Sequence, residues 1–165
     1  MPLPIPVSTV PDVLAYLKDT LRTYINDDPN PQDIYLCVGD PGMQDPPDII
    51  NLSGVTRTLP HLAMVGDGGF NALEEVYDVD VIVSASMRGV DAEAISPLII
   101  ARAWQLQAYV EHAVRQDPSL GGLVLTSWPT GGTGGAPRWA PPTAQGDVLG
   151  MLCEIVSKIS VENSL

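Results

Sequence analysis

The amino-acid sequence predicts an α+β fold in which two helices pack on one mostly antiparallel sheet. Two long segments repeat apolar side chains at three- and four-residue steps, which is typical of amphipathic helices. Residues 74–87 instead alternate between apolar and polar side chains, which indicates a strand with one buried face. The chain has 165 residues, so we expect a single domain over residues 1–165.

The first helix is predicted to begin near Thr9 or Pro11. Thr9 can accept hydrogen bonds from the free amides of the first turn, and Pro11 suits that turn. The helix should end in residues 27–31, which are rich in Asp and Pro. Its apolar stripe consists of Val13, Leu14, Leu17, Leu21, Tyr24 and Ile25.

Two short apolar runs, residues 34–38 and 49–52, indicate strands that precede the long one. Residues 53–71 are ambiguous, although their apolar side chains favour one more short strand. The long strand is predicted from Glu74 to Met87. Its buried set should be Tyr77, Val79, Val81, Val83 and Ala85.

The second helix is predicted to begin at Ser96, as the cap, and to run to about Gln116. We expect Trp104 of this helix to lie in the core. Further strands are predicted over residues 123–128 and 147–161. The core stripe of the helix should be Ile99, Ala103, Leu106, Val110, Ala113 and Val114.

Residues 129–146 are predicted to form a long loop, because half of them are Gly or Pro. Trp128, Arg138 and Trp139 flank this segment or lie in it. Tryptophan and arginine are favoured at the centre of protein interfaces. Two interpretations stay open for them: contact with a neighbouring subunit, or packing back onto their own domain.

The chain is strongly acidic, with 20 Asp and Glu against 8 Lys and Arg and a net charge of -12. This balance excludes a protein that grips nucleic acid or anionic membranes with a basic face. Acids are dense between Asp27 and Asp91, and Asp78 and Asp80 should share one strand face. They are interpreted either as a solvated surface or, with Glu75, as acids that line a pore or face a partner.

No catalytic, metal-binding or cofactor-binding signature is present in the sequence, so no cofactor and no metal are predicted. Neither His61 nor His112 has a catalytic motif around it. Cys37 and Cys153 each lie in an apolar run and should be buried free thiols. We find neither a signal peptide nor an apolar run of about 18 residues, and we expect the chain to fold in a reducing cytosol.

Residues 74–124 resemble the tail terminator proteins of long-tailed, non-contractile bacteriophages, and the amino-terminal pattern of a first helix followed by residues 34–39 and a glycine turn also fits this family, so the resemblance covers about 110 residues. The resemblance rests on Glu-Glu-Val-Tyr-Asp-Val at 74–79, on Arg-Ala-Trp at 102–104 in a long Ala-rich helix, and on Val-Arg-Gln-Asp-Pro-Ser-Leu-Gly-Gly at 114–122. It implies a structural virion protein without enzymatic activity, at the head-proximal end of the tail and made in the host bacterial cytoplasm.

The resemblance further implies a ring, usually a hexamer, that caps the completed tail tube, stops its polymerisation and provides the docking surface for the head-side connector. The implied partners are further copies of the chain, the tail tube protein and the connector or neck proteins. No association with a membrane is implied. DNA would pass through the bore as non-specific cargo, because carboxylates repel its phosphates. Arg88 is then expected to meet an acid of the next subunit.

Three alternatives stay open. The chain could be another neck subunit, such as a head–tail joining or stopper protein. It could be a small acidic cytosolic enzyme whose carboxylate site includes Glu75, Asp78 or Asp80. It could also be an acidic adaptor that mimics DNA for a basic partner.

Overall fold

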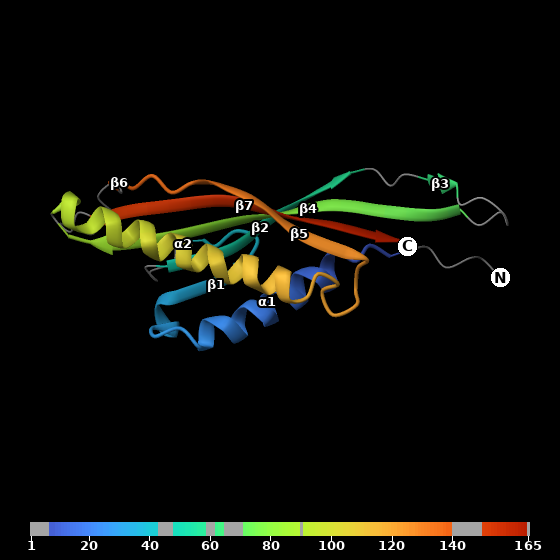
Figure 1. Cartoon of the computed structure of the whole chain (residues 1–165), viewed down its shortest axis with the longest axis horizontal. Helices are drawn as coiled ribbons and strands as arrows, with labels where there is room; N and C mark the ends of the chain where they lie inside the picture. Colours follow the sequence, from blue (N-terminus) through green and yellow to red (C-terminus); the bar gives the residue numbers. More distant parts are fainter. Residues whose placement is uncertain are drawn as a thin grey trace.

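Two helices lie along one face of a long, twisted sheet (Figure 1). The computed structural model describes residues 7–42, 48–58, 62–64, 71–89, 91–139 and 150–164. The helices are α1 (Val10–Asn26) and α2 (Ala92–Gln116), with a 3₁₀ turn over Pro31–Asp33. The strands are β1 (Ile34–Val38), β2 (Asp48–Thr58), β3 (Leu62–Met64), β4 (Asn71–Arg88), β5 (Thr126–Gly134), β6 (Arg138–Trp139) and β7 (Gly150–Ser164). The prediction of an α+β fold with two helices on a mostly antiparallel sheet is confirmed.

The sheet is built around β4 and β7, which pair antiparallel from Glu74 opposite Ser164 to Arg88 opposite Gly150. The strand order is β1-β2-β4-β7-β5, with β3 paired to β4 and β6 paired to β7. β1 pairs parallel with β2, and the other described pairs are antiparallel. The two long central strands therefore carry most of the side chains on both faces of the sheet.

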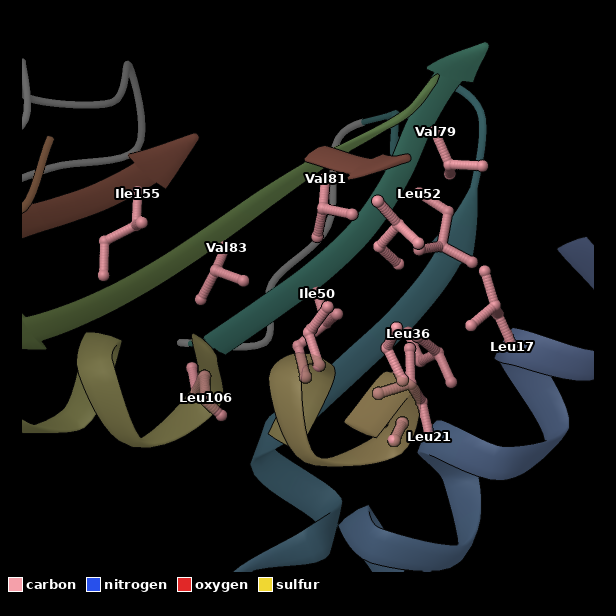
Figure 2. Close-up of a cluster of buried hydrophobic side chains, with 14 of the residues drawn as sticks. Leu17, Leu21, Leu36, Ile50, Leu52, Val79, Val81, Val83, Leu106 and Ile155 are labelled. Carbon is pink, nitrogen blue, oxygen red and sulfur yellow. The ribbon is translucent and has the colours of Figure 1, made fainter. Parts of the chain in front are cut away.

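The core lies between the two helices and one face of the sheet, and it uses the side chains that the alternation of β4 predicts. Tyr77, Val79, Val81, Val83 and Ala85 are all buried. Complete burial of a Val, Leu or Ile side chain contributes roughly 1.5–3 kcal/mol to stability. Figure 2 shows part of this core, with side chains from both helices and four strands: Leu17, Leu21, Leu36, Ile50, Leu52, Val79, Val81, Val83, Leu106 and Ile155. The core stripe predicted for α2 is buried in full, as are Val13, Leu17, Leu21 and Ile25 of α1.

The start of α2 differs from the prediction. The helix begins at Ala92, and the Asp91 side chain caps it by accepting hydrogen bonds from the amides of Glu93 (3.1 Å) and Ala94 (3.3 Å). Ser96 lies inside the helix, where its hydroxyl donates to the Ala92 carbonyl at 2.6 Å. Asp is as good an N-cap as Ser, and it here satisfies two free amides. The placement of the cap at Ser96 was therefore wrong by about one turn.

The predicted loop over residues 129–146 is also wrong in part. Residues up to Gly134 continue β5, and Arg138 and Trp139 form β6. The ladder with β7 has a bulge between Thr130 and Thr133, and a bulge accommodates glycines that would weaken a regular strand. Gly134 has a φ of +117° and lies so close to the Glu154 carbonyl that a side chain would clash there. Residues 140–146 lie outside the described part of the chain.

The bounds of the other strands differ less from the predicted ones. β2 is longer than the predicted run 49–52, β3 lies in the ambiguous segment, and β7 takes the place of the strand predicted over residues 147–161. Cys37 and Cys153 are buried free thiols, as predicted, and burial raises the pKa of each. His61 lies outside the described residues.

Candidate functional site

Glu75 is a buried acid that holds the beginning of α1 against the sheet. It has no exposed surface, and its carboxylate accepts hydrogen bonds from the Ser8 hydroxyl (2.5 Å), the Thr9 amide (3.0 Å) and the Thr9 hydroxyl (2.9 Å). The Arg57 guanidinium lies 3.2 Å away. Burial alone would raise the pKa of Glu75, but these donors and the charge of Arg57 outweigh it and lower the pKa.

The prediction that Glu75 lines a bore or faces a partner is therefore wrong, because its side chain is completely buried. The residue shares the inward side of β4 with Tyr77, whose hydroxyl lies 3.0 Å from that of Thr9. Extension of the predicted alternation by one step would have placed Glu75 inside. Thr9 is the N-cap residue of α1, as predicted, but its side chain bonds to the sheet instead of to the helix amides.

Asp78 and Asp80 lie together on the opposite face of β4, as predicted. The ammonium group of Lys158 on β7 lies 3.5 Å from Asp78 and 3.8 Å from Asp80, and the Ser160 hydroxyl donates to Asp78 at 2.7 Å. About a third of each aspartate side chain is exposed. Both carboxylates thus remain accessible while they share one lysine.

We call this side of the sheet the bare face, because both described helices lie on the other side (Figure 1). The alternation along the paired strands β4, β7 and β6 places its charged residues. Among the residues whose side chains the structure describes, they are the acids Asp78, Asp80, Glu154 and Glu162 and the bases Arg88, Arg138 and Lys158. Among these described side chains, the acids outnumber the bases by four to three.

The candidate interface residues lie at the rim of the sheet and remain partly exposed. Trp128 points outward beside Ser160, and it and Trp139 are each 42% exposed. Arg138 lies 3.9 Å from Glu154, a solvent-exposed ion pair worth about 0–1 kcal/mol. Each tryptophan therefore packs partly on its own domain and leaves surface for a neighbour, so both interpretations of these residues stay open.

Arg88 is exposed at the end of β4 and makes no ion pair with any described residue. It lies at the same end of the sheet as β6, because β4 and β6 both pair with residues 150–152 of β7. Its expected contact with an acid of another subunit stays a prediction. Trp104, by contrast, is not in the core as predicted but 42% exposed on α2.

Arg102 lies at the centre of a buried ion-pair cluster that the sequence interpretation missed. Its guanidinium contacts Asp48 at 2.6 Å and both oxygens of Asp28 at 2.8 and 3.3 Å. The Tyr109 hydroxyl donates to Asp28 at 2.7 Å, and the Asn30 amide donates to it at 2.9 Å. The cluster thereby joins α2 to the turn after α1 and to the start of β2.

Burial and ion pairing act against each other in this cluster. At Asp28, hydrogen bonds from Arg102, Tyr109 and Asn30 outweigh burial and lower the pKa to about 2. At Asp48, burial is the stronger influence and raises the pKa in spite of Arg102. The two carboxylates in turn raise the pKa of Arg102.

Asp28, Asp48 and Arg102 of the cluster line a cleft of about 470 Å³, which is also lined by Met87 and the exposed Leu98. Arg102 already donates to aspartates through each of its three nitrogens, so it is engaged within the chain. A carboxylate with a pKa near 2 is a weak base. The arrangement is therefore suited to holding three segments together, and we find no sequence signal that links residues so far apart along the chain.

Within the described residues, no group of three or more His, Cys, Asp or Glu side chains is placed to hold a metal ion. Neither described helix is long and apolar enough to cross a membrane. A comparison with models of known protein families found no match, and neither did a comparison with curated proteins.

Proposed function

We propose that this chain is the subunit of a homo-oligomeric ring, most simply a hexamer, that caps the completed tail tube of a long-tailed bacteriophage. The ring stops polymerisation of the tube and offers its other side to the head-side connector. It works through shape and charge, within the virion, and it carries out no bond-making step.

The observation that carries this proposal is the structure of the motif on which the family resemblance depends most, Asp117 to Gly122. The Asp117 carboxylate accepts hydrogen bonds from the Ser119 hydroxyl and the Gly121 amide, both at 2.6 Å. Leu120 is completely buried, although its φ is +48°. Gly121 and Gly122 have φ values of +73° and +80°, a conformation that favours glycine.

The motif is therefore a turn that connects α2 to β5, and its residues have architectural roles. The resemblance continues through β4 and α2, which pack together to form the middle of the domain. The residues on which the resemblance depends thus shape the fold and take no part in a reaction. A resemblance of this kind supports a structural function.

The bare face supports the proposed passage of DNA. Its described acids outnumber its described bases, this excess would be repeated around a ring, and a wall of negative sign does not hold phosphates. Lys158 lies between Asp78 and Asp80, so its positive charge is offset where DNA would pass. We propose that these two acids face the bore.

The proposal is tested by adding the purified protein to tail tubes that are still elongating. We expect elongation to stop, and tube length to become independent of the remaining tube protein. Continued elongation in the presence of excess protein would overturn the proposal. Binding to DNA-filled heads without binding to tubes would instead assign the chain to the head-side part of the neck.

A further inference from the structure

The exposed side of α2 carries no Asp, Glu, Lys or Arg over five turns of helix. The two charged residues in this span are engaged elsewhere: Arg102 in its buried cluster, and Glu111 with Arg115 at 3.0 Å. We call this side the uncharged helix face. Its exposed residues are Ala94, Pro97, Leu98, Ala101, Trp104, Gln105, Ala108 and His112.

The uncharged helix face has two protruding apolar side chains, Leu98 and Trp104, with small side chains between them. Leu98 is 59% exposed and Trp104 is 42% exposed, and the helical repeat places them about 120° apart around the axis. Ala94, Ala101 and Ala108 follow each other at seven-residue steps, so they form a line nearly parallel to the axis. Short side chains along this line allow another chain to approach the helix closely.

The uncharged region continues from α2 onto the neighbouring edge of the sheet. A Cβ added to Gly135 would lie only 3.2 Å from the indole nitrogen of Trp104, so the two segments are in contact. The chain contains no Asp, Glu, Lys or Arg from Pro118 to Pro137, a stretch that includes all of β5. Leu125 is 63% exposed there, whereas Trp128 of the same strand is exposed on the bare face beside Ser160.

We propose that this uncharged surface, over α2 and the adjoining β5 edge, is where neighbouring copies of the chain meet. The proposal rests on the proposed function, which requires copies to associate. Two copies that each carry a net charge of -12 repel one another, so their contact is most favourable where neither presents a carboxylate. A basic partner would instead be attracted to the acidic surfaces elsewhere on the molecule.

Size also favours a contact that includes β5. From Ala94 to His112 the helix is about 27 Å long and about 10 Å wide, a footprint of roughly 300 Å². A stable interface buries about 800 Å² on each partner. The helix face alone is therefore too small, and the adjoining β5 edge supplies the additional uncharged area.

The test places one charge in the middle of the surface, with the variant Ala101→Glu. Ala101 is exposed and Glu is a good helix former, so the helix should persist, which circular dichroism verifies. Ala101→Gln is the size-matched neutral variant. Ala15→Glu makes the same change at an exposed position of α1 and serves as the control. Self-association is followed by sedimentation velocity over a range of concentrations.

We expect Ala101→Glu to raise the concentration needed for association by about tenfold or more, while Ala101→Gln has a smaller effect and Ala15→Glu has none. Association of Ala101→Glu at the wild-type concentration would overturn this inference and leave the proposed function intact. A wild-type protein that stays monomeric at every concentration, with and without tail tubes, would overturn both.

Discussion

The hydroxyl of Tyr16 on α1 donates a hydrogen bond of 2.7 Å to the carboxylate of Asp117, which follows the last residue of α2. The bond joins the two helices at the turn that leads into β5. Hydrogen bonds from Ser119, Tyr16 and Gly121 lower the pKa of Asp117 to about 2. One carboxylate thus orders the turn and holds it against the first helix.

Replacement of Asp117 by Ala should therefore destabilise the domain more than replacement of Tyr16 by Phe. The first change removes all of these hydrogen bonds, whereas the second removes one, at a cost of about 0.5–1 kcal/mol for a solvent-accessible pair. Urea unfolding of the two variants measures the difference. Equal losses of stability would show that the turn does not depend on Asp117.

Replacement of Arg102 by Met should cost about 3–5 kcal/mol, because it removes the only cation that pairs with these two buried carboxylates among the described residues. Arg22→Met is the matched control, since Arg22 is exposed and makes no ion pair with the described residues. Its effect should stay within about 0.5 kcal/mol. Chemical denaturation near neutral pH compares the two, and a similar small loss for both would contradict the structural role of the cluster.

The same cluster predicts a specific sensitivity to acid. Folding lowers the pKa of Asp28 from 3.8 to about 2, so the unfolded chain binds the proton more readily. The stabilisation is complete above about pH 4 and is lost as the pH falls through about 2, and it amounts to roughly 2 kcal/mol. The stability difference between wild type and Asp28→Asn should shrink by this amount between pH 5 and pH 2. A difference that does not change with pH would refute the assignment.

Glu75 should matter for the attachment of α1. Replacement by Gln keeps the shape of the side chain but removes the charge that Arg57 and the donors around Thr9 stabilise. We expect a loss of about 1–3 kcal/mol and faster hydrogen exchange in the first turn of α1. Unchanged exchange in that turn would show that the carboxylate does not hold it.

The bare face gives a prediction about DNA. The double change Asp78→Asn and Asp80→Asn removes both carboxylates that lie beside Lys158, so the positive charge of this lysine is no longer offset. We expect DNA binding that weakens steeply with salt, whereas the wild type binds none. The control is Asp12→Asn with Asp19→Asn on the exposed side of α1, which changes the net charge equally. Equal DNA binding by both double variants would mean that the bare face has no special part.

Strict local patterns explain what could be predicted from the sequence. The alternation in β4 identified its buried face, and the spacing of apolar residues in α2 identified its core stripe, because each pattern directly reflects backbone geometry. Trp104 was misplaced because its size favours burial, whereas its position on the helix places it beside Gly135 at the surface. The general tendency of tryptophan to be buried therefore did not predict the position of Trp104.

The remaining features depend on contacts between distant parts of the chain. Arg102 meets Asp28 and Asp48 across separations of 74 and 54 residues, and no local signal connects them. The Gly- and Pro-rich end of β5 resembles a loop in composition, yet it pairs with β7 through a bulge. Of the predicted site residues, Asp78 and Asp80 lie together as expected, whereas Glu75 is buried.

Negative-stain imaging of tail tubes incubated with the purified protein tests the central claim most directly. We expect a closed ring of copies of this chain at one end of each tube, with an open bore in line with the tube. Tubes with two bare ends, in the presence of protein that remains monomeric, would contradict it.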